Sequence, residues 1–288
     1  MHLVVAMQAE ALPLIAHYGL EEEDRRSMFP VYRSETVRLV ISGVGKSMAA
    51  AATGYLHALA GSPQHMPWIN AGIAGHGDLT IGKLVQACRI SDRASGRNWY
   101  PPQVVNAGLE RTPVMTVDHP ERAYTEALAY DMEAAGFYPA ACRCSTAELV
   151  QSLKVISDNP EVSVETLNPN RVEQLLGDRI REIAGFTREL QALAKIAAAM
   201  EVTPNVFEQL HKRWHFTVTQ QHRLRRLLQR WSTLITDERE LEASLIECRD
   251  ATGILNALER HLDAYPVRFP LSKSGFSQKS SLDACKNA

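Results

Sequence analysis

The sequence has no long hydrophobic run, although 45% of its 288 residues are hydrophobic. A transmembrane helix needs about 20 consecutive apolar residues, and no stretch approaches that length. The first apolar run, in MHLVVAMQAEALPL, has no lysine or arginine before it and is interrupted by Glu10. It therefore predicts a buried first strand and not a signal peptide, and we expect no membrane partner.

Cysteine is scarce, and its spacing does not fit a metal site. The chain has five cysteines, an odd number that argues against a complete disulfide framework. Cys142 and Cys144 are only two positions apart, and no pair has the spacing of zinc ligands. We therefore expect reduced thiols, a cytoplasmic location and no metal site.

Neither sign of charge is in large excess, since the formal net charge is −2. No overall electrostatic field therefore selects nucleic acid or an anionic membrane as a partner. Residues 211–231 are a local exception, because they carry Lys and Arg, no Asp or Glu, and the interleaved aromatics Trp214, Phe216 and Trp231. Such a stripe binds nucleic acid in some proteins. A solvated helix face with its aromatics packed inside is the commoner structure, so nucleic-acid binding here is the lesser alternative.

Short apolar runs alternate with helical patterns in the first part of the chain. The alternation predicts an α/β fold, with a mixed, largely parallel central sheet flanked by helices. The glycine- and proline-rich segment 93–120 predicts a loop with one short strand at Val114–Val117, and Asp131–Cys142 predicts a helix. The strand-like runs are LVVAM (3–7), MPWINAGIAG (66–75), IGKLVQACRISD (81–92) and SLKVISD (152–158).

The second part of the chain has helical patterns alone. Apolar residues at three- and four-residue spacing predict helices over 171–200, 205–233 and 237–263, which form an all-α C-terminal extension. We therefore expect an α/β domain over 1–200, a helical extension over 201–265 and a loose polar tail over 266–288.

Two glycine turns follow predicted strands. ISGVGKS (41–47) is not a phosphate-binding P-loop, because Val40 stands where that motif needs its first glycine. It still predicts a helix N-terminus near Ser42, Gly43 and Gly45, whose free N–H groups suit an anion or a polarised water. In NAGIAG (70–75), the residues Ala71, Gly72 and Ile73 would let backbone approach a ligand closely. Taken alone, the first motif is equally compatible with a structural turn, and the second is more often a structural turn.

The order of these features is more specific than any one of them. Glu10 follows the first strand, the two glycine turns come next, then DMEAA (131–135), and finally a strand that ends in ISD (156–158). This order resembles the purine nucleoside phosphorylase and nucleosidase superfamily. The resemblance is strongest to the branch with methylthioadenosine/S-adenosylhomocysteine nucleosidase and futalosine hydrolase, and it covers about residues 1–200.

The resemblance implies a purine nucleosidase-like hydrolase that cleaves an N-glycosidic bond without a cofactor. Glu133 would accept hydrogen bonds from the ribose hydroxyls, and Met132 would form the apolar floor under the sugar. Asp158 would act at N7 of the base, and Glu10 would help to activate water. The partners would be a small-molecule nucleoside and further copies of the chain, in a homo-oligomer that is a dimer or a trimer.

Two alternatives remain at this point. A phosphorylase would use phosphate as co-substrate, and such pockets usually hold arginines. The stretch HMPWINAG contains none, so we favour water as the nucleophile. A non-catalytic nucleoside-binding or scaffolding protein would use the helical extension to contact a partner. The segment 93–130 motivates this second alternative, because it is short for the family. It contains Trp99, Tyr100 and TVDHP, but no residue that can be assigned to stack on the base.

Overall fold

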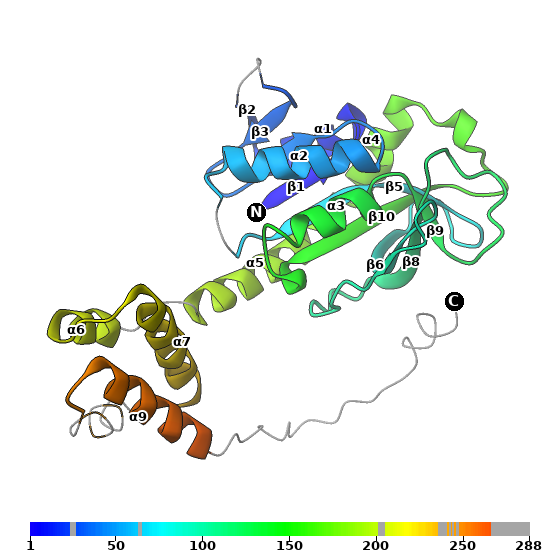
Figure 1. Ribbon diagram of the computed structural model, residues 1–288. Helices are drawn as coiled ribbons and strands as arrows, with labels where there is room; N and C mark the ends of the chain where they lie inside the picture. Colours follow the sequence, from blue (N-terminus) through cyan, green and yellow to red (C-terminus); the bar gives the residue numbers. More distant parts are fainter. Residues whose placement is uncertain are drawn as a thin grey trace. The chain divides into compact units, whose positions relative to one another are not determined.

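The computed structural model describes residues 1–23, 27–62, 65–200, 205–235 and 248–265, with the isolated positions 241, 243 and 245. The chain is divided into two compact units. The described residues of the first are Met1–Lys195, and the second begins at Ile196. Figure 1 shows both units with their elements labelled.

The first unit is an α/β fold built on one sheet. Its strands are β1 (His2–Val5), β2 (Glu21–Glu22), β3 (Val31–Arg33), β4 (Arg38–Ile41), β5 (Trp68–His76), β6 (Leu84–Asp92), β7 (Asn98–Trp99), β8 (Glu110–Thr116), β9 (Ala129–Asp131) and β10 (Val150–Asp158). Its helices are α1 (Gln8–Tyr18), α2 (Lys46–Leu59), α3 (Ala134–Ala141), α4 (Pro169–Asp178) and the part of α5 (Ile180–Met200) that precedes Ile196, with the short 3₁₀ turns η1 (Ala147–Leu149) and η2 (Val164–Thr166).

The sheet is mixed, as expected, but it is not clearly parallel. Among the described residues, five strand pairings are parallel and five are antiparallel. The parallel arrangement holds for the neighbours β4, β1, β5 and β10. Strand β3 turns directly back into β4 across residues 34–37, which is too short for the crossover that a parallel pair needs.

Part of the sheet closes on itself. Strand β5 pairs with β10, β10 with β6, β6 with β8, β8 with β9, and β9 again with β5. The ring brings the carboxyl ends of β5, β9 and β10 close to one another. Each of these ends carries residues that the sequence singled out.

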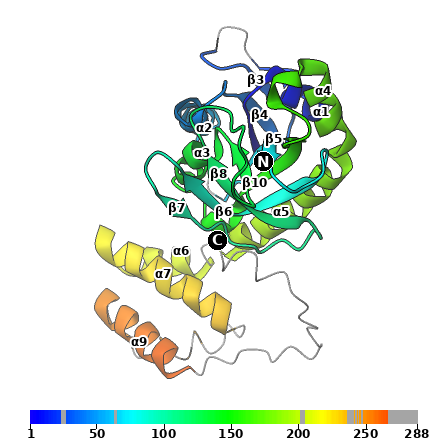
Figure 2. The same ribbon diagram turned by 90° about the vertical axis from the view of Figure 1, so that its right-hand side faces the viewer.

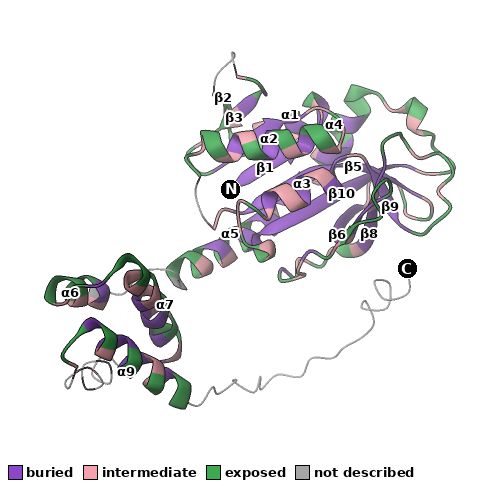
Figure 3. Cartoon of the chain, in the orientation of Figure 1, coloured by how far each residue is buried: buried purple, intermediate pink, exposed green. Residues whose placement is uncertain are grey.

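Alternation along the strands explains why helices cover both faces of the sheet. In β1, Leu3 and Val5 pack in one hydrophobic core, whereas Val4 packs in another. The first core lies under α1, α4 and α5, and the second lies under α2 and α3. Figure 2 shows these two groups of helices on opposite sides of the sheet. The strands between them are almost wholly buried (Figure 3).

Several predicted elements have different bounds in the structure, and the helix expected over 205–233 is interrupted at residues 214–217. The helix expected over Asp131–Cys142 is the end of β9 followed by α3, which begins at Ala134 after the N-cap residue Glu133, and the Ala134 N–H donates to the Asp131 carboxylate. The helix expected over 171–200 is two helices, α4 and α5, which meet at Arg179. Strand β8 begins at Glu110, four residues before the predicted strand, because it pairs with β6 along its whole length.

The second unit is helical in its described part and has its own core. Its helices are α6 (Asn205–Arg213), α7 (Val218–Leu234) and α9 (Ala251–Ala264). Phe216 and Trp231 of the basic stripe lie in that core, and Arg223 and Arg230 pair with acids of α9. The stripe is therefore partly neutralised, and two of its three aromatics are not available to stack on bases.

Other expectations concern membranes, metals and thiols. No helix in the described ranges is both long enough and apolar enough to cross a bilayer. Nor do the described residues contain a group of three His, Cys, Asp or Glu side chains placed to hold a metal ion. Cys142 and Cys144 have free thiols.

Candidate active site

A cavity of about 490 Å³ lies where the strands of the first unit end. It gathers residues that are far apart in the sequence, because the carboxyl ends of β1, β5, β9 and β10 meet there. The residues predicted from the sequence that line it are Glu10, Ile73, Met132, Glu133 and Asp158. The other predicted positions lie behind this lining.

Glu10 is buried and held by backbone on both carboxylate oxygens. Its Oε2 accepts hydrogen bonds from the N–H groups of Ala6 and Met7, at 2.8 and 3.0 Å, and its Oε1 accepts one from Ile73 at 3.0 Å. Burial raises the pKa of Glu10, against the lowering effects of the Lys154 charge and of these N–H donors. The side chain is thus rigidly placed and readier than an exposed glutamate to accept a proton.

The Glu133 carboxylate lines the cavity and accepts one hydrogen bond from the described part of the protein. Its Oε1 accepts a hydrogen bond from the Gly45 N–H at 2.9 Å. Burial raises its pKa to about 7, with a further contribution from the negative charges of Asp131 and Glu10, while Lys154 and the Gly45 N–H act in the opposite direction. A carboxylate has about four acceptor positions, so Glu133 keeps acceptors for a ligand.

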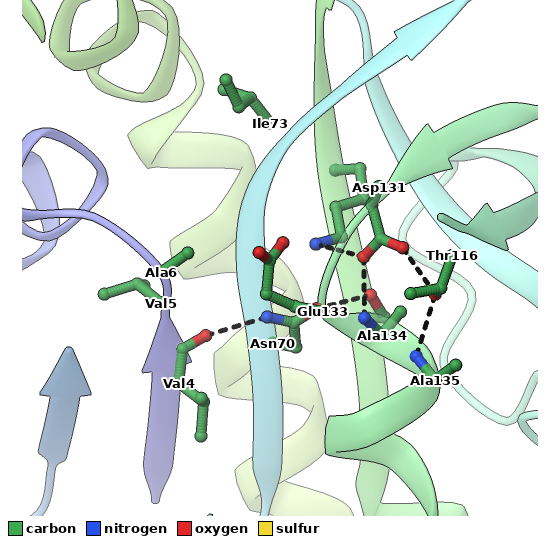
Figure 4. A network of polar contacts seen from close by, with 12 residues as sticks. Val4, Val5, Ala6, Asn70, Ile73, Thr116, Asp131, Glu133, Ala134 and Ala135 are labelled. Atoms are coloured by element: carbon green, nitrogen blue, oxygen red, sulfur yellow. Dashed lines mark hydrogen bonds and ion pairs between the residues drawn. The ribbon is translucent and has the colours of Figure 1, made fainter. Parts of the chain in front are cut away.

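Asp131 is paired by the protein and not by the cavity. Its Oδ1 accepts a hydrogen bond from the Thr116 hydroxyl at 2.7 Å, and its Oδ2 accepts one from the Ala134 N–H at 2.8 Å (Figure 4). The same Oδ2 lies 2.8 Å from Nζ of Lys154, whose side chain is 1% exposed. The two carboxylates of the DME sequence therefore have different partners.

Lys154 lies behind three acids. Burial, the strongest effect, lowers its pKa, but the combined attraction of Asp131, Glu133 and Glu10 raises the pKa above the ordinary value of lysine. It is therefore a permanent positive charge at neutral pH. Without this charge, three carboxylates would share one buried volume uncompensated, which is strongly unfavourable.

Asp158, at the end of β10, receives two side-chain donors. The Ser157 hydroxyl donates to its Oδ1, and the Tyr124 hydroxyl donates to its Oδ2. Asp158 is 5% exposed, yet it lines the cavity. Gly75 leaves room for it, because a Cβ there would come within 2.3 Å of Oδ2.

The residues of the first glycine turn support the site from behind. The hydroxyl of Ser42 donates to the carbonyl oxygens of Val5 and Gly43, so it is not directed at the cavity. Gly43 and Gly45 have φ values of +81° and +106°, which side chains with a Cβ rarely adopt. Only Val44 of the turn lines the cavity. The N–H of Gly45 is used by Glu133 and not left for an anion.

The second glycine turn permits close packing of Glu10. A Cβ on Gly72 would lie 2.7 Å from Oε1 of Glu10, so a larger residue would push this carboxylate away. Ala71 is buried and does not line the cavity. Ile73 lines it and gives its N–H to Glu10.

The cavity wall is apolar and acidic. Among the described lining residues there is no Lys, Arg or His. Apolar contacts come from Met7, Val44, Val117, Pro120, Val164, Leu167, Pro169 and Val172. Its carboxylates are Glu10, Glu121, Asp131, Glu133 and Asp158.

Three site residues were not anticipated from the sequence. Lys154 had a signal, because a lysine in the middle of an apolar strand, SLKVISD, needs a buried partner. No pattern in the sequence pointed to Tyr124 or Tyr130, since neither stands in a run with the periodicity of a helix or a strand. Of the aromatics that stand in the short segment, Trp99 packs against the core and Tyr100 is 65% exposed. Neither lines the cavity, whereas Val117 and Pro120 of TVDHP do.

No protein-family model matches this sequence, and no curated protein matches it either. Solved structures do match its fold. The 5′-methylthioadenosine nucleosidase of Arabidopsis thaliana is 18% identical with a TM-score of 0.54, over 67% of this chain and 94% of that one. The futalosine hydrolase of Helicobacter pylori is 17% identical with a TM-score of 0.53, over 65% and 97%.

A third match is a structure with a bound base. The methylthioadenosine/S-adenosylhomocysteine nucleosidase of Colwellia psychrerythraea, in complex with adenine, is 17% identical with a TM-score of 0.56, over 66% of this chain and 94% of that one. The chain has the fold of these nucleosidases. The resemblance inferred from the motifs is therefore confirmed at the level of the fold.

Proposed function

We propose that the protein is a purine nucleosidase, a hydrolase that cleaves the N-glycosidic bond of a purine nucleoside or thionucleoside. The observation that carries the proposal is the meeting of Glu10, Glu133 and Asp158 in one cavity whose described lining has no basic side chain. The nucleosidase fold supports it.

Glu133 holds the ribose in this proposal. Its free acceptor positions suit two vicinal hydroxyls, which donate hydrogen bonds to a carboxylate more strongly than to a neutral group. Met132 lines the cavity beside it and supplies an apolar surface for the sugar. The Gly45 N–H fixes the carboxylate from behind.

Asp158 acts at the leaving base. Departure of the base leaves negative charge on its ring nitrogens, and a proton or hydrogen bond at N7 stabilises that charge. The Ser157 hydroxyl holds Asp158 in place on one oxygen. The other oxygen, Oδ2, accepts a hydrogen bond from the Tyr124 hydroxyl.

Glu10 activates the attacking water. The bond to the base breaks through an oxocarbenium-like state, water adds to the sugar carbon, and its proton passes to a carboxylate. A glutamate whose pKa is raised by burial accepts this proton more readily. Lys154, a fixed positive charge nearby, limits the repulsion among the acids.

Water suits this cavity better than phosphate does. A phosphate dianion beside Glu10, Glu133 and Asp158 would need compensating cations, and the described lining has none. The proposal is therefore hydrolysis, with neither phosphate nor a cofactor required.

The test is release of free base from a panel of purine nucleosides and 5′-thionucleosides, with and without phosphate. We expect release without phosphate, and a drop of about 10²–10⁴-fold in kcat/KM for Asp158→Asn, the usual contribution of a general acid. Release of free base only in the presence of phosphate would show that the protein is a phosphorylase. Tight nucleoside binding without any release would instead show a binding or scaffolding protein.

A further inference from the structure

The Tyr124 side chain contacts Asp158. Its hydroxyl donates to Oδ2 of Asp158, and its ring lies over Gly75, where an added Cβ would come within 2.7 Å of the ring. This is the carboxylate that the proposed function assigns to the base. A base that bonds to Oδ2 would therefore compete with the Tyr124 hydroxyl for this oxygen.

Tyr124 belongs to residues 118–128, which we call the strap. The strap connects β8 to β9 and lines the cavity through Pro120 and Glu121. Three ion pairs attach it to separate elements, with N–O distances of 2.6–2.9 Å: Lys46–Asp118, Arg93–Glu121 and Arg122–Glu165.

Two of the three ion pairs, Lys46–Asp118 and Arg122–Glu165, are weak anchors, whereas Glu121 of the third is only 13% exposed. Arg122 and Glu165 are 74% and 65% exposed, and Asp118 is 55% exposed, so water and salt screen their attraction. The hydrogen bond from Tyr124 to Asp158 lies deeper, because Asp158 is 5% exposed, so water competes with it less than with the exposed ion pairs. It therefore holds the inner edge of the strap.

Two features oppose the closed arrangement. Tyr124 has a φ of +44°, which is uncommon and unfavourable for a residue with a Cβ. The hydroxyl of Tyr130, against whose ring Tyr124 packs edge-on, is buried without a hydrogen-bond partner in the described part of the chain. Both penalties would be relieved if the strap moved outward.

We propose that Tyr124 is a gating residue, an internal competitor that covers Asp158 and must leave it before a purine base can bind. The inference rests on the proposed function, because it takes Asp158 as the site of the base. It predicts that the strap lowers the affinity for a base and that the Tyr124 hydroxyl carries much of this effect.

The test compares Tyr124→Phe and Tyr124→Ala with the wild-type chain. Adenine affinity is measured by calorimetry, and hydrogen exchange of the strap amides is measured without ligand. We expect adenine to bind at least about tenfold more tightly to both variants, which corresponds to 1.4 kcal/mol. We also expect faster exchange in residues 118–128. Tyr100→Phe, the same change at an exposed tyrosine, should alter neither quantity.

Two different results would overturn the inference, and only the second would overturn the proposed function as well. If adenine binds the wild type and Tyr124→Phe equally, or the variant more weakly, Tyr124 is not a competitor and the proposed function is unaffected. If adenine binds none of the proteins and no nucleoside is cleaved, the proposed function fails and the gate for a base fails with it. Strap exchange that is unchanged in both variants would also count against the gate.

Discussion

Single residues in this cavity differ in how their charge is compensated. Asp131 and Lys154 form a buried ion pair, and Glu10 accepts three backbone hydrogen bonds. Glu133 accepts only one, from Gly45, although its side chain is buried. Among these acids, Glu133 is therefore the one whose ionised form is least stabilised by the protein and most open to stabilisation by a ligand.

This imbalance gives a pH-dependent prediction for Glu133→Gln. The folded pKa of Glu133, about 7, exceeds its unfolded value of 4.5, so the folded state binds more protons between these values. The free energy of unfolding contributed by this group therefore falls as the pH rises from 4.5 to 7. The glutamine variant, which does not titrate, should match the wild type near pH 5 and be more stable at pH 8 by about 1–3 kcal/mol. Urea unfolding at both pH values measures this.

The same substitution should weaken ligand binding. It removes the charge and one acceptor oxygen, and each charge-assisted bond contributes roughly 1.5–3 kcal/mol, so nucleoside affinity should fall by about 100-fold or more. Glu35→Gln, at an exposed glutamate, is the control. Lower stability at pH 8 together with unchanged affinity would remove the ribose role from Glu133.

At the scale of elements, the contact between α2 and α3 positions the site. Gly136 of α3 faces the backbone of Lys46 at the start of α2, and a Cβ there would lie 1.8 Å from the Lys46 carbonyl oxygen. The two helices thus meet backbone to backbone. This contact brings the Gly45 N–H to Glu133, across 88 residues of sequence.

Two glycine-to-alanine variants should have opposite effects on stability. Gly136→Ala forces α2 and α3 apart, so we expect a loss of about 1–3 kcal/mol in the free energy of unfolding, and weaker ligand binding through Glu133. Gly54→Ala, inside α2 with open space around its Cβ position, should gain up to about 1 kcal/mol from helix propensity. Urea unfolding of the two variants measures both. Equal effects would show that the α2–α3 contact tolerates a methyl group.

At the scale of the whole molecule, the two units have separate hydrophobic cores. The cavity and its lining belong to the first unit, between Ala6 and Val172. The core of the second unit is built from α6, α7 and α9, with Leu224, Leu228 and Trp231 at its centre. The stability of each unit can therefore be measured separately, and ligand binding belongs to the first unit.

We expect calorimetry to resolve two thermal transitions. A ligand stabilises only the part that binds it, by about 2.7 kcal/mol at a concentration 100 times Kd, so adenine should raise one midpoint alone. Leu228→Ala should lower the other, since truncating a buried leucine costs about 2–5 kcal/mol. Leu56→Ala, at a buried leucine of the first unit, should lower the midpoint that adenine raises. A single transition moved by every change would contradict this separation.

The sequence by itself determined what depends on local pattern. Short apolar runs predicted the buried strands β1, β5 and β10, and the order of Glu10, Glu133 and Asp158 pointed to a nucleosidase fold, which the solved structures confirm. Periodicity reports which face of an element is buried, and so it also predicted the helical second part.

Only the tertiary structure decided which polar groups meet. Lys154 compensates Asp131 through strand pairing in a closed ring of mixed direction, and the ring was not predictable because local pattern does not encode which strands become neighbours. Tyr124 reaches Asp158 from an irregular segment 34 residues away, where no periodicity exists to interpret. The raised pKa of Glu133 follows from burial, and burial is a property of the packed molecule and not of the sequence around the residue.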